Sequence, residues 1–561
     1  MHQTLRLALV GAACLAARAS AVPLRAQERE IFVNTTSFLG SLASHCLPGQ
    51  PCTIESALEK TQTFGGVVTA CFEGGCPPGI TPLGTDDPNY DPATGKWSIR
   101  YGPKWVGLLI DRTGVKVDFT RHVEGWSGPA DNRLVIDTDV GLTFNHILTI
   151  EGHDNVLMGF DLRGRFDDAA IIVRKGATGN QIGPGLVFAG IKRGPGLRIL
   201  DGGTTRNRVV GNWCGIVGPD AQPDVLDEDC VQLDTGANGN TIGGPEPADR
   251  NVLSGAKFGV ALRNPATRDN VIQGNYIGLD PTGAIARPNE SGVAILEQAS
   301  GTLVTGNVLS GNNNAGIFAV DASTEFGRTR TPIQGNIIGA DATGKKPVPN
   351  GDYGVRIEGL AKDVQVVGNR IRYNGAGGVL ICGALTRNNT VSENEISGNH
   401  GSAISVCAAA NEGVAPPVLT RVSTTDAAGA ACAGCRVELF SDPLEEALSF
   451  EGAVTADATG AFSLSKPEGF AYRNLTATAT DDKNTSGLSA ARGATRPTLT
   501  PTLRPGEATA TPGGRTPTPT RPPATGTPQS RVFLPWLARA FERAAAWGLL
   551  TPRAGSTYND G

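Results

Sequence analysis

A short segment built around Gly-Asn recurs through the middle of this 561-residue chain. The stretch Asp269–Ile295 shows it most fully, with Gly274-Asn275 followed by an apolar segment that opens at Gly292. Other copies stand at residues 211–212, 306–307, 335–336 and 368–369, and Glu393-Asn394 is a degenerate copy. From Asn275 onward the asparagines lie 32, 29, 33 and 25 residues apart, a spacing typical of solenoids and propellers.

The apolar segments between these pairs predict short strands. Each has three to five residues bounded by Gly and Asn, which is too few for a helix; examples are Gly259-Val-Ala-Leu, Gly316-Ile-Phe-Ala and Gly378-Val-Leu-Ile. Such strands bury no face alone and share a core only when they stack rung upon rung. The sequence therefore predicts an all-β, right-handed parallel β-helix. Its recurring asparagines are expected to stack as a ladder that bonds the backbone of the neighbouring turn.

Composition divides the chain into further segments. A basic Arg6, an apolar run and Ala19-Ser20-Ala21 predict a signal peptide over residues 1–26. In the N-terminal region Thr53 is expected to open a short helix that covers the first rung. The predicted segments are an N-terminal cap region (27–95), the β-helix (96–410), an immunoglobulin-like β-sandwich (411–490), a Thr/Pro-rich linker (491–530) and a tail that is a candidate sorting signal (531–561).

Ten cysteines remain after the signal peptide, and an even number in an exported chain favours disulfides. No histidine accompanies them at the spacing of a metal site, so metal binding is the minority interpretation. They fall into the close pairs Cys46/Cys52, Cys71/Cys76, Cys214/Cys230, Cys382/Cys407 and Cys432/Cys435.

Charge and hydropathy limit the partners. The net charge is −5 with scattered Lys and Arg, which predicts no nucleic-acid partner. No later apolar run is long enough to span a bilayer. We expect a secreted or cell-surface protein, monomeric, that meets a polysaccharide or the cell envelope.

Several motifs resemble a family of secreted bacterial β-helix repeat proteins of the pectin-lyase-like superfamily. Its repeats read like Asn270-Val-Ile-Gln-Gly-Asn-Tyr-Ile-Gly-Leu-Asp-Pro-Thr-Gly283, echoed at residues 335–344. Cys52-Thr-Ile-Glu-Ser-Ala-Leu58 resembles its N-terminal Cys-Ser-Leu-Arg-Glu-Ala motif, with Glu and Ser in place of Arg and Glu. Residues 477–486 resemble the sandwich that often follows, and the Thr-Pro stalk also recurs in such proteins. The resemblance implies the fold and says little about activity.

A row of polar residues is expected along one edge of the solenoid, two positions before the residue that opens each strand. Successive members should lie about 4.8 Å apart, which places Asp168 and Glu228 roughly 10 Å apart, near the upper limit for inverting glycosidases. The row consists of Asp168, Gly194, Glu228, Lys257, Glu290, Asn314, Asp352 and Ala376.

The row and the residues near it yield two sets of candidates. A catalytic site would use Asp168, Asp229 and Arg165; in a lyase the carboxylates would bind Ca²⁺ and an arginine would act as base, and Asp229-Cys230-Val231 faintly resembles the Asp-Asp-Cys-Ile of polygalacturonases. The other motifs of that family, Gly-His-Gly, Asn-Thr-Asp and Arg-Ile-Lys, are missing from the sequence. The residues expected to bind ligand are Asp167, Asp227, Glu228, Lys257, Glu290, Tyr276 and Tyr353.

Three functions stay open at this point. The leading hypothesis is a non-catalytic protein that binds polysaccharide or another extended ligand, and the alternatives are a polysaccharide lyase or glycoside hydrolase and a structural envelope protein or adhesin. No cofactor is required by the sequence. Ca²⁺ is a candidate, either beside the acidic cluster of a lyase or at Asp280 and Asp341, although an Asx-turn is the favoured interpretation of those two aspartates.

Overall fold

A computed structural model describes residues 29–36, 46, 51–73, 76–101, 107–138, 142–322 and 330–494. The predicted signal peptide, the predicted sorting-signal tail and nearly all of the predicted linker lie outside these residues. No helix within the described ranges is long and apolar enough to cross a membrane.

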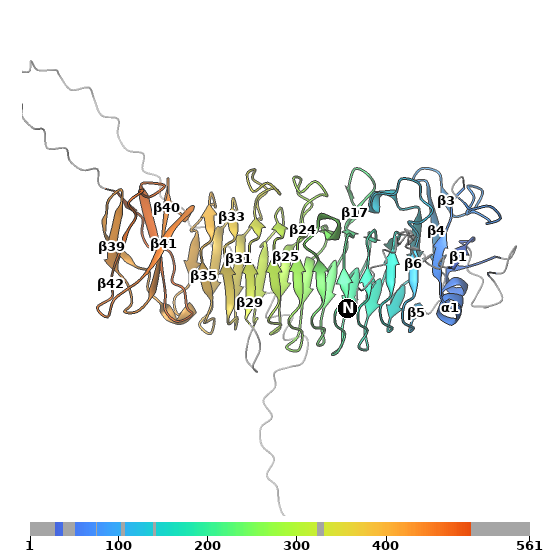
Figure 1. Ribbon diagram of the computed structural model, residues 1–561, viewed down its shortest axis with the longest axis horizontal. Helices are drawn as coiled ribbons and strands as arrows, with labels where there is room; N and C mark the ends of the chain where they lie inside the picture. Colours follow the sequence, from blue (N-terminus) through green and yellow to red (C-terminus); the bar gives the residue numbers. More distant parts are fainter. Residues whose placement is uncertain are drawn as a thin grey trace, which may run out of the picture. The chain divides into compact units, whose positions relative to one another are not determined.

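Three long, almost entirely parallel sheets run side by side through most of the chain (Figure 1). The first sheet contains β1 (Glu30–Val33), β2 (Val67–Ala70), β6 (Lys116–Asp118), β9 (Val156–Met158), β12 (Gln181–Ile182), β15 (Arg208–Val209), β20 (Thr241–Gly243), β23 (Val271–Gln273), β26 (Leu303–Thr305), β29 (Thr331–Gln334), β32 (Val364–Val367) and β35 (Thr390–Ser392). The second contains β3 (Tyr90–Asp91), which is antiparallel to its neighbour, then β4 (Lys96–Tyr101), β7 (Leu134–Thr138), β10 (Asp161–Arg163), β13 (Val187–Phe188), β16 (Trp213–Cys214), β21 (Val252–Leu253), β24 (Tyr276–Ile277), β27 (Val308–Leu309), β30 (Ile337–Ile338), β33 (Arg370–Arg372) and β36 (Glu395–Ser397). The third contains β5 (Leu108–Ile110), β8 (Leu148–Ile150), β11 (Ile171–Val173), β14 (Leu197–Ile199), β19 (Val231–Leu233), β22 (Phe258–Leu262), β25 (Ser291–Ile295), β28 (Ile317–Val320), β31 (Tyr353–Glu358), β34 (Gly377–Cys382) and β37 (Ile404–Val406).

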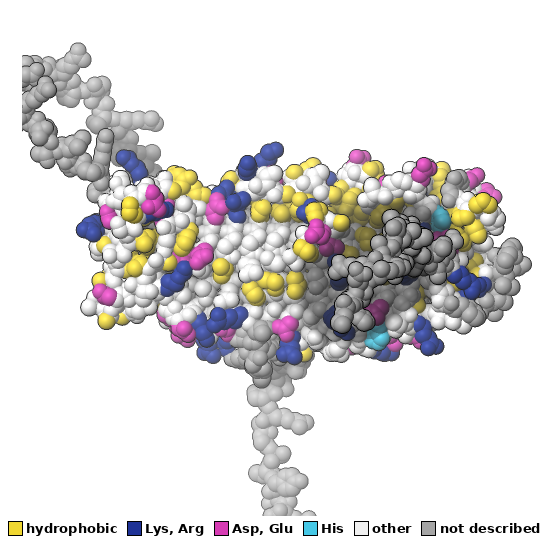
Figure 2. Space-filling view, in the orientation of Figure 1, with side chains coloured by type: hydrophobic (Ala, Val, Ile, Leu, Met, Phe, Trp, Pro, Cys, Tyr) yellow, Lys and Arg dark blue, Asp and Glu magenta, His cyan; other side chains and the backbone are white. Residues whose placement is uncertain are grey.

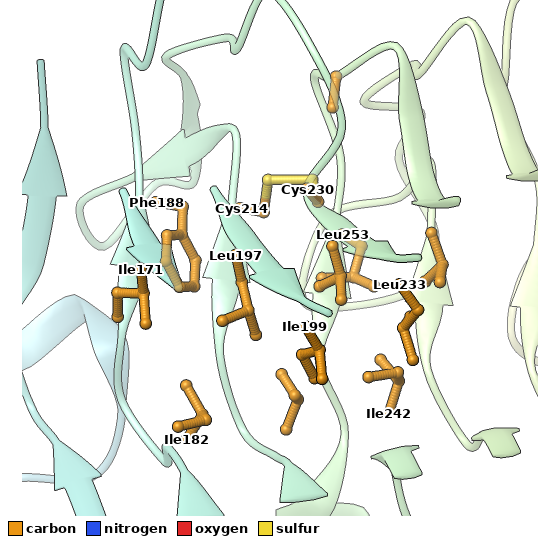
Figure 3. Packing of buried hydrophobic residues seen from close by; sticks show 14 of the residues in the cluster. Ile171, Ile182, Phe188, Leu197, Ile199, Cys214, Cys230, Leu233, Ile242 and Leu253 are labelled. Carbon is orange, nitrogen blue, oxygen red and sulfur yellow. A yellow bond between two sulfur atoms is a disulfide. The ribbon is translucent and has the colours of Figure 1, made fainter. Parts of the chain in front are cut away.

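Each turn of the chain adds one strand to each sheet, so the architecture is the predicted right-handed parallel β-helix. Residues in register stack from rung to rung, as Ile171, Leu197, Val231 and Val260 do on the third sheet. The inward-facing side chains of all three sheets meet in one continuous apolar core, and Figure 3 shows Phe188, Leu197 and Ile242 approaching it from three sides. Minor elements are the hairpin β17 (Ile216–Val217) and β18 (Gln222–Pro223) and the 3-10 turns η1 (Pro129–Asp131), η2 (Pro247–Asp249) and η3 (Ala410–Gly413).

The predicted asparagine ladder is present, and there are three of them, one near each corner of the rung. In each ladder the side-chain amide oxygen of one asparagine accepts from the asparagine of the preceding rung, and its amide nitrogen donates to a backbone carbonyl. The buried polar groups at the corner are thereby satisfied by the same residue type on neighbouring rungs. The longest runs along the Gly-Asn turns through Asn212, Asn251, Asn275, Asn307, Asn336, Asn369 and Asn394. The others run through Asn155, Asn180, Asn207, Asn240 and Asn270, and through Asn289, Asn312, Asn350, Asn374 and Asn399.

The N-terminal end of the solenoid carries the predicted helix, α1 (Ile54–Phe64). The Thr53 hydroxyl accepts the Ser56 N–H at 3.3 Å, and Ile54, Ala57 and Leu58 are buried in the core. An exposed first rung would offer unpaired strand edges, which this helix helps to cover.

Two antiparallel sheets follow the last rung and enclose a small core that includes Leu419, Val437 and Leu475. They contain β38 (Val418–Val422), β39 (Asp426–Ala430) and β42 (Ala461–Ser465), and β40 (Arg436–Asp442), β41 (Ser449–Thr455), β43 (Asn474–Thr480) and β44 (Arg492–Gly493). The strands that the sequence indicated are present, and an immunoglobulin-like topology stays a prediction.

This C-terminal pair of sheets covers the final rung, a feature that sequence reasoning did not anticipate. The buried Glu438 carboxylate accepts the Glu393 N–H at 3.0 Å, and the Glu446 carboxylate accepts the Asn399 N–H at 3.1 Å. Phe440 and Ala447 join the apolar core of the solenoid. The open end of the β-helix is thereby closed by both carboxylates and apolar contacts.

All ten described cysteines form disulfides, in the five close pairs of the sequence: Cys46–Cys52, Cys71–Cys76, Cys214–Cys230, Cys382–Cys407 and Cys432–Cys435. The Cys214–Cys230 bond joins the second sheet to the start of the third at the rim of the core (Figure 3).

Candidate binding surface on the third sheet

The predicted row of polar residues lies along the entrance to the third sheet. Backbone hydrogen bonds connect Lys257 to Glu228, Asn314 to Glu290 and Asp352 to Asn314, each from one rung to the next. Glycine at position 194 places its backbone directly against the Asp168 carbonyl. The row is therefore a regular stack, as the repeat predicted.

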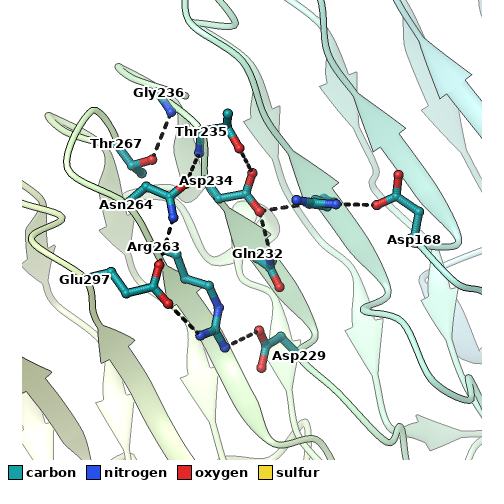
Figure 4. A network of polar contacts seen from close by, with 11 residues as sticks. Asp168, Asp229, Gln232, Asp234, Thr235, Gly236, Arg263, Asn264, Thr267 and Glu297 are labelled. Atoms are coloured by element: carbon teal, nitrogen blue, oxygen red, sulfur yellow. Dashed lines mark hydrogen bonds and ion pairs between the residues drawn. The ribbon is translucent and has the colours of Figure 1, made fainter. Parts of the chain in front are cut away.

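Asp168 is held by an arginine that sequence reasoning did not single out. Arg198 lies on the outer face of β14, with its Nη1 2.5 Å from Asp168 Oδ1 and its Nε 2.8 Å from Asp234 Oδ2. The dashed lines that reach Asp168 and Asp234 from the side chain between them in Figure 4 mark these two bonds. Asp234 is itself buried and also accepts from Gln232 and from the Thr235 hydroxyl. The arginine thus joins carboxylates from the turn before β11 and the end of β19, across three rungs.

Asp229 is the most unusual ionisable group of this surface. Its side chain is 1% exposed, and Arg263 Nη2 approaches Oδ2 at 3.5 Å, while Oδ1 has no hydrogen-bond partner among the described residues. Burial raises the pKa of Asp229 to about 6, and the nearby Glu228 adds to the shift while Arg263 opposes it. Arg263 also reaches Glu297 at 3.6 Å, so it bridges a buried and an exposed carboxylate.

The remaining predicted charged residues are mostly neutralised in pairs. Asp167 contacts Arg193 at 2.8 Å, Asp227 contacts Lys192 at 3.2 Å and Glu228 contacts Lys257 at 3.2 Å. Glu290 lies beside Asn314, at 3.5 Å. Arg165 is exposed in the turn that leads to the third sheet, and its backbone forms an isolated parallel β-bridge with Lys192. No bond from Arg165 to Asp168 or Asp229 is found among the described residues.

The two predicted tyrosines lie on different sheets. Tyr276 is on β24 of the second sheet, beneath the Arg250 guanidinium at 4.2 Å, while Tyr353 opens β31 of the third sheet and packs on Gly377. The structure therefore brings Tyr353 to the predicted row and separates Tyr276 from it.

A second charged cluster lies further along the same face. Arg356 on β31 bonds Asp352 at 2.6 Å and holds both oxygens of Glu358, at 2.8 and 2.9 Å. Its guanidinium also lies 5.2 Å from the centre of the Phe318 ring. Burial opposes the charge of Arg356, but the bonds to both carboxylates raise the pKa of its guanidinium. Between the two clusters lies a small apolar patch of Phe258, Ala261, Ala294 and Leu296.

The geometry of the three predicted catalytic residues does not form an accessible acid–base pair. A general acid or base must come within hydrogen-bond reach of the substrate. Asp229 has a pKa suited to such a role but is buried, Asp168 is bound by Arg198, and Arg165 stands apart. What the surface offers is a rigid row of paired charges at the spacing of the rungs.

The two predicted turn aspartates bond the backbone of their own turns four and five residues on, whereas the expected Asx-turn is defined by a bond two residues on. Asp280 Oδ1 accepts the Ala284 and Ile285 N–H groups at 3.1 and 3.0 Å, and Asp341 Oδ1 accepts the equivalent groups of Lys345 and Lys346 at 3.0 Å. Burial acts to raise the pKa of both carboxyls, but these hydrogen bonds outweigh it and lower the pKa below its ordinary value. Within the described ranges no three Asp, Glu, His or Cys side chains are arranged to hold a metal, and Oδ1 of each turn aspartate already accepts N–H groups of its own turn.

The repeat region is similar to a known family. Residues 205–412 match the family described as periplasmic copper-binding protein (NosD). No three described His, Cys, Asp or Glu side chains form a metal cluster, and the described cysteines are all in disulfides, so copper binding is not carried over to this chain. No curated protein is significantly similar in sequence.

Several solved structures match parts of the chain at low identity and low TM-score. They include the periplasmic alginate epimerase AlgG (14% identity, 61% of this chain and 76% of that one, TM-score 0.25) and the A-module of the Azotobacter vinelandii mannuronan C-5 epimerase AlgE4 (14%, 64% and 93%, 0.29). Tailspike protein 2 of bacteriophage CBA120 is another (9%, 78% and 73%, 0.31). TM-scores of this size indicate no more than a general likeness, so what those proteins act on is not transferred to this chain.

The disulfides and the match to a periplasmic family indicate a location outside the cytoplasm, extracellular or periplasmic. The chain is a right-handed parallel β-helix repeat protein whose repeat region, residues 205–412, resembles the NosD family.

Proposed function

We propose that the protein binds an extended polysaccharide along the outer face of the third sheet and does not cleave it. The observation that supports this most directly is the regular row at the entrance to that sheet, from Glu228 through Lys257 to Asp352. A ligand with a repeating structure can meet repeating side chains at several rungs, and the ion pairs hold those side chains in place without a conformational change on binding.

The charges on this surface favour a polymer that binds through its hydroxyl groups over a polymer that binds through a high charge of one sign. Cations and carboxylates on this surface are paired. The face in view in Figure 2 carries side chains of both signs and no large patch of one sign. The finer location that we propose is the outside of the cell, with the Thr/Pro-rich segment acting as a stalk.

The competing function, a lyase or hydrolase, is favoured by one observation. The pKa of Asp229, raised by burial to about 6, lies in the range of general acids that work near neutral pH. A rearrangement that exposed this carboxyl would be needed before it could reach a substrate.

Affinity electrophoresis of the full chain in gels that contain neutral or acidic polysaccharides tests the proposal. We expect retardation by at least one polymer and its loss in Arg198→Ala and Lys257→Ala. Arg208→Ala is the matched control, because Arg208 makes a similar pair with Asp249, at 3.1 Å, from the first sheet.

The same incubations are followed for reducing ends and for unsaturated products. Products that vanish in Asp229→Asn would establish the enzyme and overturn the proposal. Retardation by none of the polymers, without products, would instead support a structural envelope protein or adhesin.

A further inference from the structure

A cleft of about 700 Å³ lies where the last rungs of the second sheet meet the C-terminal sheets. Its walls come from β33 and β36 on one side, and from β41 and the Ala471–Tyr472 segment on the other. The two sides are joined by backbone bonds between Ile396 and Ala447, at 2.9 and 3.1 Å, and by the Glu446 carboxylate. The cleft is therefore part of a fixed junction, on a different sheet from the proposed polysaccharide row.

Aromatic side chains are exposed at this cleft. Of the large hydrophobic residues exposed in the described ranges, two are aromatic, Phe450 at 38% and Tyr472 at 39%, and both line it. Tyr373 contributes a third ring. Exposed aromatic faces gathered in one concave site mark a place where a ligand is bound.

Tyr373 holds a backbone conformation that aromatic residues rarely adopt. Its φ is +62°. On the next rung the same position is Gly398, with φ +68°; two rungs earlier it is Gly311, with φ +74°, and Pro349 occupies it on the rung between. Each of the four precedes an asparagine of the same ladder. A left-handed conformation costs energy for a residue with a bulky side chain, so Tyr373 stands here against the local backbone preference.

A β-bulge presents the other two rings. Leu439 pairs with Gly452 and Phe440 pairs with Phe450, which leaves Glu451 as the extra residue of β41. The buried Glu451 carboxylate accepts the Ala471 N–H at 2.8 Å and the Lys466 ammonium at 2.5 Å, so the bulge also fixes the segment that carries Tyr472. Phe450 rests against Phe440, with ring centres 5.8 Å apart.

The polar side chains of the cleft are neutralised or uncharged. Glu395 is paired with Arg372 and, at 2.8 Å, with Arg370, and Glu393 contacts Arg436 at 3.1 Å. Ser397 and Ser449 add hydroxyl groups. Aromatic faces suit a ligand with an apolar face, and paired polar groups suit a ligand with many hydroxyls and no net charge. A neutral pyranose combines these properties.

We propose that this junction cleft is a second glycan site, which stacks the pyranose rings of a neutral oligosaccharide on Tyr373, Phe450 and Tyr472. The site is independent of the row on the third sheet, and its ligand can be a different polymer or a different part of the same one.

Isothermal titration of the full chain with neutral hexasaccharides of β-1,4-linked glucose and mannose, and with the hexasaccharide of galacturonate, tests this site. We expect a neutral hexasaccharide to bind, and binding to weaken at least tenfold in Phe450→Ala and Tyr472→Ala. Val418→Ala is the control, because Val418 is 63% exposed on β38 of the other C-terminal sheet. Arg198→Ala, which disrupts the third-sheet row, is expected to leave this binding unchanged.

Tyr373→Gly separates binding from stability. Glycine accepts the left-handed conformation, so the melting temperature is expected to stay the same or rise while the affinity for the neutral hexasaccharide falls. Binding that survives both Phe450→Ala and Tyr472→Ala, tighter binding of the galacturonate hexasaccharide, or no binding of either neutral hexasaccharide at millimolar concentration would each overturn the proposal.

Discussion

Two charged clusters on the outer face of the third sheet use arginine in different ways. In the first, Arg198 and Arg263 connect carboxylates from different rungs, and one of those carboxylates, Asp229, is buried with one oxygen that has no partner among the described residues. In the second, Arg356 bonds Glu358 of its own strand and Asp352, the residue just before that strand. The second cluster is local and complete, whereas the first holds several rungs together around a buried charge.

The difference indicates where the surface is energetically sensitive. Removing one partner of a buried ion pair leaves an uncompensated charge, while partly exposed carboxylates can turn to water. The first cluster should therefore respond strongly to substitution and to pH, and the second should respond weakly. If both clusters respond alike, burial of Asp229 is not the property that separates them.

The largest effect is expected for Arg263→Ala. This change leaves the Asp229 carboxylate buried without its cation, which should lower the free energy of unfolding by about 3–5 kcal/mol at pH 8. Denaturant unfolding followed by circular dichroism measures the loss.

The double variant Asp229→Asn/Arg263→Ala supplies the control. Because the buried charge is gone, most of the stability should return. A double variant as unstable as Arg263→Ala alone would show that the arginine acts through packing and not through Asp229.

The second effect is the pH dependence of stability. The folded-state pKa of Asp229, about 6, lies above its ordinary value of 3.8, so the folded protein binds this proton more tightly. The contribution is complete below about pH 4 and is lost as pH rises through 6, with a total on the order of 3 kcal/mol. Relative to the wild type, Asp229→Asn should therefore gain stability between pH 4 and pH 7. Parallel curves for the two proteins over this range would contradict the assignment.

The periodic parts of this molecule could be predicted from sequence. Gly-Asn turns and short apolar segments report local geometry that every rung repeats, so the solenoid, the ladder through Asn275 and the row from Glu228 to Asp352 all follow from spacing. The Thr53 cap was predictable for the same reason, because capping depends on residues three positions apart.

The pairing partners could not be predicted in the same way. Arg198 and Asp234 are 36 residues apart, and their contact depends on the lengths of the intervening loops. An alignment of the central residue of each third-sheet strand would have placed Arg198 and Arg356 in one column, and both would then have been recognised. Tyr373 also had a signal, since it stands before the ladder residue Asn374, where the other ladder asparagines of that corner follow only Gly or Pro. The docking of Glu438 and Glu446 on the last rung had none, because it joins segments with different periodicities.

A third effect compares the two clusters directly. Arg198→Ala removes bonds to Asp168 and to the buried Asp234 and should cost about 2 kcal/mol, because a buried carboxylate loses its charged partner. Arg356→Ala should cost about 1 kcal/mol, because Asp352 and Glu358 are both partly exposed. The two variants are compared by denaturant unfolding at pH 7, and a larger loss in Arg356→Ala would reverse the ranking.

The smallest effect tests whether the second cluster depends on guanidinium geometry. Arg356→Lys keeps the charge but has one nitrogen in place of the two that bond Asp352 and Glu358, and it loses the guanidinium contact with the Phe318 ring, so we expect a loss of about 0.5–1 kcal/mol. Arg208→Lys is the matched control, since Arg208 makes one exposed contact with Asp249 and should lose almost nothing. Equal stability of Arg356→Lys and the wild type would mean that the second cluster needs only a positive charge. The face between Phe318 and Glu358 would then be less rigid than the proposed polysaccharide row requires.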